Sequence, residues 1–299
     1  MAFNEMSSPM RPTIWENLLG VELTQGYVDA KGIRTRFLRA GRPGAVPLVL
    51  LHGTTGHVET YARNIRAHAE HFDVIALDML GHGFTDKPET GYEIIDYAQH
   101  VADTLDALGL DTVLLSGQSL GGWVAARFTL LWPHRVRRLC LNTTGGAHSD
   151  PGAMKSIREK TIAAAENPTP EVVRKRLEFL MADPTRVTDE LVACRRAVYQ
   201  TPGMIEATRR ILCLQDPDTR TRNLLTDEEW SRITAPTLVL WTTHDPTAPV
   251  EVGQRIARCI SGSVFELMQN CGHWPQWEDP ENFNRLHMAF MHGTQGGAR

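Results

Sequence analysis

The stretch Gly117-Gln118-Ser119-Leu120-Gly121 decides the fold of this chain. An apolar run typical of a buried strand, residues 112–115, precedes it, and small and apolar residues typical of a helix, residues 122–126, follow it. A strand, a tight G-x-S-x-G turn and a helix hold a serine in a strained backbone conformation, for which the flanking glycines make room. Taken alone, the pentapeptide also fits an ordinary glycine-rich turn. The rest of the chain supplies partners that favour the catalytic interpretation. Ser119 is then predicted to lie at the helix N-terminus, which stabilises negative charge.

The composition is that of a globular protein with a sizeable core. The chain has 299 residues, of which 42% are hydrophobic, enough for one large domain or a core with an insertion. Its net charge of -4 favours neither nucleic acid nor an anionic membrane as a partner. The five scattered cysteines fit reduced thiols and lack zinc-like spacing. The start of the chain lacks the apolar segment of a secretory signal. We therefore expect a cytoplasmic protein that acts on a small molecule and binds no metal, nucleic acid or membrane.

Strand-like and helix-like segments alternate along most of the chain. Residues 26–40 are predicted to form a hairpin around the Lys31-Gly32 turn. Further strands are predicted at 47–51, 74–77, 112–115, 139–141, 237–241 and 264–268. Helical patterns such as residues 96–108 separate most of these strands. The alternation predicts an α/β fold with a mostly parallel central sheet and helices on both faces.

The pattern changes between Ala147 and Ser231. Strand-like runs vanish there, and charged helical segments follow one another at 153–165, 170–181, 188–199 and 203–214. We predict that residues 147–231 form an inserted helical lid (cap) domain, and that residues 1–146 and 232–299 form the core domain. The alternative is a surface bundle of helices with no part in catalysis.

A serine nucleophile needs two partners, and the chain supplies both in order. The hydroxyl needs a general base within hydrogen-bond reach, and the base needs an acid that orients it. After a serine turn of this kind the acid and then the histidine follow, each at the end of a strand. Asp245 follows the predicted strand 237–241, and His273 follows the next one. This order predicts a catalytic triad of Ser119, Asp245 and His273, with His244 as a weaker rival for the base.

The tetrahedral intermediate of acyl transfer needs two donors aimed at its oxygen. The main-chain N–H of Leu120, directly after the serine, is predicted to be one of them. The second is predicted to be the N–H of Thr54, in the loop His52-Gly53-Thr54-Thr55-Gly56 after an earlier strand. The neighbouring Thr55 is a candidate substrate contact.

These motifs resemble those of the α/β-hydrolase superfamily over nearly the whole chain. The matching stretches are HG at 52, DMLGHGFTDKP at 78, GQSLGG at 117, HDPTAPV at 244 and GHWPQWEDPENFN at 272. Within that superfamily, GHWPQWE is similar to the G-H-W-x-Q-W-E of the meta-cleavage-product hydrolases, which cleave C–C bonds. The resemblance implies the α/β-hydrolase fold, no cofactor, and a homo-oligomer such as a dimer.

The resemblance also implies a reaction and a set of substrate contacts. The substrate would be a vinylogous diketone acid, made when the ring of an aromatic compound is cleaved. In that family the histidine and serine assist ketonisation, and attack on the ketone then releases a carboxylic acid and a dienoic acid. Arg195, on a lid helix, would hold the polar end of the substrate, and Trp274 would line the pocket. Gln118 stands where the family often has Asn and is a further candidate contact.

Other functions use the same residues. A carboxylesterase or lactonase acting on a small ester needs the same triad and oxyanion hole, without ketonisation. The oxyanion loop here is shorter than the family's usual H-G-x-G-P-G pattern, and Thr60 stands where the family tends to have asparagine. An amide hydrolase and a non-catalytic receptor on this fold are further alternatives.

Overall fold

One eight-stranded sheet forms the centre of the protein. The computed structural model describes residues 13–42 and 44–293, so residues 1–12, which the secretory-signal prediction concerned, lie outside it. The strands are β1 (Leu23–Ala30), β2 (Ile33–Gly41), β3 (Pro47–Leu51), β4 (Asp73–Leu77), β5 (Val113–Gln118), β6 (Val136–Asn142), β7 (Thr237–Thr242) and β8 (Val264–Met268). Their order in space is β1-β2-β4-β3-β5-β6-β7-β8, and β2 pairs antiparallel with both of its neighbours while the others pair parallel. The mostly parallel sheet and the hairpin at Lys31-Gly32 are as predicted.

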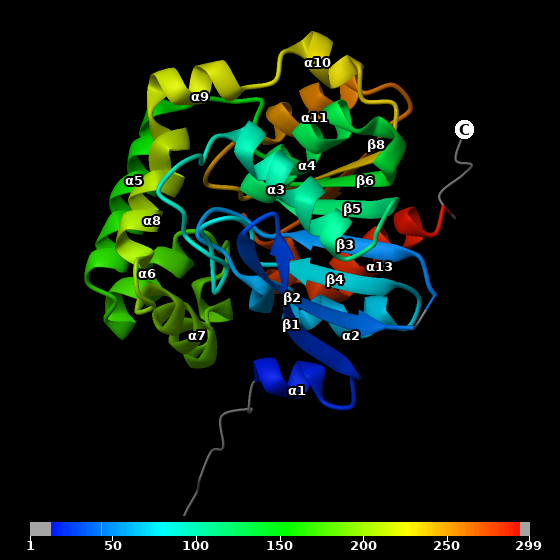
Figure 1. Ribbon diagram of the computed structural model, residues 1–299. Coiled ribbons are helices and arrows are strands. Elements are labelled where there is room, and N and C mark those ends of the chain that lie inside the picture. The colour runs from blue at the N-terminus through cyan, green and yellow to red at the C-terminus, as the bar shows by residue number, and fades with distance from the viewer. Residues whose placement is uncertain (1–12, 43, 294–299) are drawn as a thin grey trace, which may run out of the picture.

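Helices cover both faces of this sheet. Figure 1 shows α3 and α4 in front of it and α2 and α13 behind it. The helices of the core are α1 (Ile14–Leu18), α2 (Ala62–Ala69), α3 (Ile94–Ala107), α4 (Leu120–Leu131), α11 (Val250–Cys259), α12 (Pro275–Glu278) and α13 (Pro280–Met291), with the short turns η1 (Val58–Tyr61) and η2 (Pro133–Arg135). A search of the described residues for a helix of membrane-spanning length and hydropathy finds none.

A second group of helices stands between β6 and β7 in the chain. They are α5 (Pro151–Glu166), α6 (Pro170–Glu178), η3 (Pro184–Arg186), α7 (Asp189–Tyr199), α8 (Met204–Ile211), η4 (Leu212–Gln215), α9 (Pro217–Asn223) and α10 (Asp227–Ser231). Several begin at a side chain that caps the first turn, as at Asp150, Thr169 and Thr188. Figure 1 shows α5, α6, α7 and α8 beside the edge at which the arrows of β3 and β4 end. Side chains at the carboxyl ends of the parallel strands therefore face these helices.

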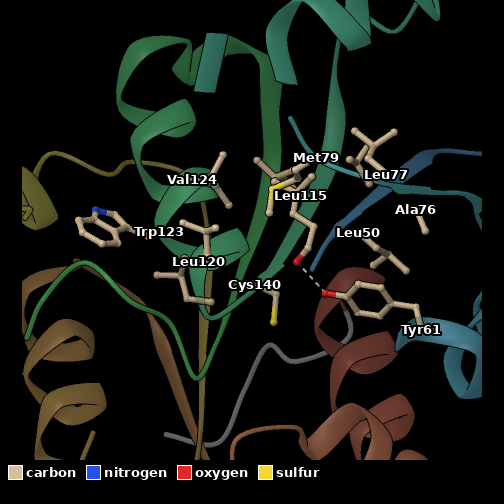
Figure 2. Close-up of a cluster of buried hydrophobic side chains, with 14 of the residues drawn as sticks. Leu50, Tyr61, Ala76, Leu77, Met79, Leu115, Leu120, Trp123, Val124 and Cys140 are labelled. Atoms are coloured by element: carbon tan, nitrogen blue, oxygen red, sulfur yellow. Dashed lines mark hydrogen bonds between the residues drawn. The ribbon is translucent and has the colours of Figure 1, made fainter. Parts of the chain in front are cut away.

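The central strands are buried on both faces. Residues of β4, β5 and β7 are buried throughout, which explains why they read as continuous apolar runs rather than alternating ones. Figure 2 shows part of the core, where Leu115, Leu120 and Val124 gather around the start of α4. The Tyr61 hydroxyl donates a hydrogen bond of 2.8 Å to the Leu51 carbonyl oxygen and satisfies a polar group inside this core. The packing holds the end of β3 close to the turn that carries Ser119.

Glycines allow α4 to approach the sheet this closely. A Cβ atom on Gly121 would overlap the Leu51 carbonyl oxygen, and one on Gly117 would overlap the Gly121 carbonyl. Backbone atoms of buried strands cannot move aside as a flexible side chain can. The two glycines of the G-x-S-x-G turn are therefore required by contact, independently of any chemistry.

The Gly121→Ala substitution is expected to lower the free energy of unfolding by on the order of 1–3 kcal/mol, because the added methyl overpacks the contact with β3. Chemical denaturation measures the loss. Gly152→Ala is a matched control, since Gly152 is exposed in the first turn of α5 and its Cβ would meet only the Asp150 carboxylate, at 3.2 Å. Equal effects of the two substitutions would contradict the contact argument.

Candidate active site

Ser119 occupies the turn between β5 and α4 in a strained conformation. Its backbone angles are φ 56° and ψ -116°, a conformation that residues other than glycine rarely adopt. The Ser119 N–H donates to the Asn142 carbonyl oxygen at 3.0 Å, so β6 helps to hold the turn. The residue occupies the N-cap position of α4, where the helix dipole favours negative charge, and its side chain makes no capping hydrogen bond. The structure thus places Ser119 where the G-x-S-x-G pattern predicted it.

His273 and Asp245 form a hydrogen-bonded pair. Nδ1 of His273 donates to Oδ2 of Asp245 at 2.8 Å, and the two side chains are 7% and 1% exposed. The other oxygen of Asp245 accepts from the N–H and the hydroxyl of Thr247, at 2.8 and 2.7 Å. A carboxylate held in this way keeps the proton on Nδ1 and leaves the lone pair of Nε2 free to act as a base.

Ser119 and His273 line one cavity together with Thr54 and Leu120. Within the described part of the chain, no hydrogen bond joins the Ser119 hydroxyl to His273. Such contacts are often long in a ligand-free site and tighten when substrate binds. The rival base His244 is exposed, and its ring bonds to the Thr243 hydroxyl at 2.9 Å. Of the two histidines, only His273 both contacts Asp245 and lines the cavity.

The predicted oxyanion donors meet at this cavity. Thr54 and Leu120 both line it, and among the described residues neither main-chain N–H has a hydrogen-bond acceptor. A Cβ on Gly53 would lie 3.0 Å from Ser119 Cβ, so the loop at 52–56 rests directly against the serine. Two N–H groups with no acceptor beside a serine at a helix N-terminus can bind a developing negative charge.

Gln118 is hydrogen-bonded to the loop that carries His273. Its side chain is buried, and its Nε2 donates to the main-chain carbonyl oxygen of His273 at 3.0 Å. The Thr143 hydroxyl donates to the same oxygen at 3.1 Å. Gln118 stands outside the lining of the cavity around Ser119, as do Arg195, Trp274 and Thr55, so its contact with substrate stays a prediction. Its position before the serine lets β5 hold the loop that carries His273.

Glu278 ties the same loop to the inserted helices. Its carboxylate accepts from the N–H groups of Gly272, Ala182 and Asp183, at 2.6, 2.7 and 3.2 Å. Burial raises the pKa of Glu278, against the stabilising effect of these donors. The His273 N–H also donates to the Leu180 carbonyl oxygen at 2.7 Å. The segment after α6 and the histidine loop are therefore held as one unit. The sequence motif contained Glu278 but nothing in it indicated this role.

Arg195 is buried, not a solvated surface residue. Its Nη1 donates to the carbonyl oxygen of Thr55 and lies 3.3 Å from that residue's hydroxyl. Its guanidinium carbon lies 5.6 Å from the ring centroid of Trp274 and 5.9 Å from that of Tyr199. Nε and Nη2 have no partner among the described residues, and burial lowers the pKa of the side chain. Arg195, Thr55 and Trp274 thus lie together, next to the cavity around Ser119 rather than in its lining.

The lining of the cavity includes a cation that the sequence did not single out. Arg220 of α9 lines the cavity with Trp123, His148 and Gln215. Its guanidinium carbon lies 5.1 Å from the centroid of the Trp123 ring. Arg220 is one of many arginines between β6 and β7, so no sequence pattern marked it.

The comparisons with known proteins establish the family of the chain. A family model described as "alpha/beta hydrolase fold" matches residues 46–280, and the chain belongs to this family. It is 32% identical to the 2-hydroxy-6-oxo-2,4-heptadienoate hydrolase of Pseudomonas putida, over 88% of this chain and 95% of that protein. The predicted superfamily and fold are confirmed, and so is the resemblance to hydrolases of meta-cleavage products.

Solved structures give the same result. The meta-cleavage product hydrolase of Pseudomonas fluorescens IP01 is 27% identical, with a TM-score of 0.79 over 90% of this chain and 98% of that one. A membrane phospholipase A, described as a bacterial virulence factor, is 25% identical, with a TM-score of 0.79 over 92% of this chain and 87% of that one. The fold is thus shared with a meta-cleavage product hydrolase and with a phospholipase A.

Gln118→Leu is expected to lower kcat roughly tenfold and to leave KM nearly unchanged, because a lost hydrogen bond worth about 0.5–1.5 kcal/mol displaces the histidine loop. Steady-state kinetics on any substrate that the protein turns over measures the changes in kcat and KM separately. Thr143→Val removes the second donor to the same oxygen and should act in the same direction. A raised KM at unchanged kcat would instead indicate that Gln118 contacts substrate.

Proposed function

We propose that this protein hydrolyses a C–C bond of a ring-fission product from aromatic compound degradation. The buried hydrogen bond of 2.8 Å between His273 and Asp245, beside a serine in the strained turn, carries the proposal. The relationship to a 2-hydroxy-6-oxo-2,4-heptadienoate hydrolase, which covers 95% of that protein, supports the choice of substrate class. Ser119 acts as the nucleophile, His273 as the base and Asp245 as the group that orients it.

The chemistry follows from the positions of these groups. His273 Nε2 accepts the proton of the Ser119 hydroxyl while the Ser119 oxygen attacks the ketone of the ketonised substrate. The N–H groups of Thr54 and Leu120 stabilise the oxyanion. The C–C bond then breaks, and its electron pair leaves with the dienoate fragment, which takes up a proton. Water, activated by His273, hydrolyses the acyl-serine to a carboxylic acid.

Arg195 holds the carboxylate of the dienoate end in this proposal. A buried guanidinium with two unpartnered nitrogens is an unusual and costly arrangement, which an incoming carboxylate would relieve. Trp274 packs beside that end of the substrate. Residues 147–231 act as the lid, since their contacts with His273 and Thr55 link lid position to the alignment of the base and the oxyanion loop.

Carboxylic ester hydrolysis is the second candidate. The structural similarity to a phospholipase A at 25% identity favours it, because an esterase needs no group beyond the same triad and oxyanion hole. It differs from C–C hydrolysis in needing neither ketonisation nor a carboxylate site at Arg195.

The first measurement is the turnover of a coloured ring-fission dienoate beside that of a short-chain nitrophenyl ester. We expect rapid loss of the dienoate's visible absorbance and slower ester cleavage. Ser119→Ala should lower kcat on both by roughly 10⁶-fold, because it removes the nucleophile. Ester turnover without bleaching would reject the C–C reaction in favour of the second candidate.

Arg195→Gln keeps a donor for the Thr55 carbonyl but removes the charge. It should lower kcat/KM on the dienoate by about 10–100-fold, the value of a charge-assisted hydrogen bond, and lower nitrophenyl ester turnover far less. Arg196→Gln is a control for general damage to α7, since Arg196 is half-buried, its Nε donates to the Pro168 carbonyl oxygen at 2.8 Å, and it does not line the cavity. Equal losses on both substrates would refute a role for Arg195 in carboxylate binding.

A further inference from the structure

Two donors hold the carbonyl oxygen of Gly53, in the loop that follows β3. The Gly56 N–H donates to this oxygen at 2.8 Å, and Nδ1 of His52 lies 2.8 Å from it. A carbonyl oxygen only accepts hydrogen bonds, so Nδ1 of His52 carries the proton of that contact. The Gly53 carbonyl group therefore points toward the His52 ring and Gly56.

The N–H of Thr54 belongs to the same peptide group as this carbonyl. The peptide is trans, and the oxygen and the amide hydrogen of a planar trans peptide point in opposite directions. Holding the Gly53 oxygen thus aims the Thr54 N–H the other way. Thr54 lines the cavity with Ser119, and among the described residues its N–H has no acceptor. The contacts of Gly53 therefore set the direction of the predicted oxyanion donor.

A contact on each nitrogen locks the ring of His52. Its Nε2 accepts the Met79 N–H at 3.1 Å, so the proton of the neutral ring stays on Nδ1. The side chain is buried, and this burial lowers the pKa of His52 well below its usual value. The ring of His82, with its centroid 4.9 Å away, lowers the pKa further. His52 is therefore a neutral donor in a fixed tautomer at neutral pH.

A side chain of the inserted helices holds the next peptide of the same loop. Nη1 of Arg195, on α7, donates to the carbonyl oxygen of Thr55. That carbonyl shares a trans peptide with the Gly56 N–H, which points the opposite way and donates to the Gly53 oxygen. A chain of hydrogen bonds thus runs from Arg195 through two peptide groups to the Thr54 N–H.

Thr55 adopts a backbone conformation that its neighbours must support. Its φ of 54° lies in the left-handed region, which is unfavourable for a β-branched residue. Both side chains that bond to it come from α7: Arg195 donates to its carbonyl oxygen, and the Tyr199 hydroxyl lies 3.4 Å from its own hydroxyl. The strained turn before Gly56 is therefore held by the inserted helices.

We infer that Arg195 and His52 are positioning residues of the oxyanion hole, which together hold two peptide groups so that the Thr54 N–H faces the cavity. This inference rests on the proposed function and adds to it, since Arg195 there only binds the substrate's carboxylate. Because Arg195 belongs to the inserted helices, the oxyanion hole is complete only when these helices are packed on the core. A substrate without a carboxylate still depends on Arg195.

Binding of butylboronic acid tests this orientation without turnover. The acid forms a tetrahedral anion on a serine nucleophile, and this anion resembles the tetrahedral intermediate of hydrolysis. It carries no carboxylate for Arg195 to bind. Isothermal titration measures its dissociation constant, and loss of binding in Ser119→Ala identifies the serine adduct. A smaller fraction of folded protein changes the number of sites but not this constant.

Two pairs of variants separate donation from packing. Arg195→Met removes the donor to Thr55 and should weaken the binding of butylboronic acid at least tenfold, whereas Arg195→Lys keeps a donor and should stay within threefold of the wild type. His52→Leu should act like Arg195→Met. His52→Asn offers an amide nitrogen close to the place of Nδ1 and should recover part of the loss.

Arg176→Met is the matched control. Arg176 is a buried arginine of α6, and its Nε donates to the Thr161 hydroxyl of α5 at 2.9 Å, within the inserted helices. This variant should bind butylboronic acid within threefold of the wild type. Wild-type affinity in a folded Arg195→Met protein, or equal weakening by Arg195→Met and Arg195→Lys, would overturn the inference.

Kinetics distinguish this inference from the C–C hydrolase proposal. On nitrophenyl butyrate, Arg195→Met should lower kcat at least tenfold and change KM less than threefold, because the oxyanion forms only in the transition state. Arg195→Lys should keep most of kcat. If the wild type cleaves the ester but no dienoate, the C–C proposal fails and these losses still support the positioning role. If Arg195→Met affects only the dienoate, Arg195 serves the carboxylate alone and the inference fails.

Discussion

The close approach of α4 to the ends of β3 and β5 is the contact on which the rest of the site depends. It places Ser119 at a helix N-terminus with a positive φ, and it requires that Gly117 and Gly121 carry no side chain. The same approach brings the loop after β3 against the serine, so that the N–H groups of Thr54 and Leu120 face one cavity. In the proposed mechanism, this backbone packing forms the oxyanion-binding position before any substrate contributes to it.

The histidine loop is attached to the sheet on one side and to the inserted helices on the other. Gln118 and Thr143 hold the carbonyl group of His273, while Leu180 accepts its N–H. Glu278 adds main-chain contacts on the side of the inserted helices. A displacement of these helices must therefore strain the loop that carries the proposed base, which gives a physical route from substrate entry to alignment of the site.

Charge inside the site is distributed unevenly. Both oxygens of Asp245 accept hydrogen bonds, whereas Arg195 and Arg220 are desolvated and form no ion pair with a carboxylate in the described chain. Burial of a cation without an anionic partner lowers the free energy of unfolding, and an anionic ligand would offset this cost when it binds.

The sequence by itself determined the α/β fold, the strands, some of the helices, and the candidates Ser119, Asp245 and His273. These follow from local patterns, since a strand end or a glycine turn is specified by neighbouring residues. Only the tertiary structure decided that Gln118 supports His273, that Glu278 links two segments, and that Arg220 lines the cavity. Each of these contacts joins residues far apart in the chain. Their side chains acquire a role only when the sheet and the inserted helices have packed, and local sequence carries no record of that packing.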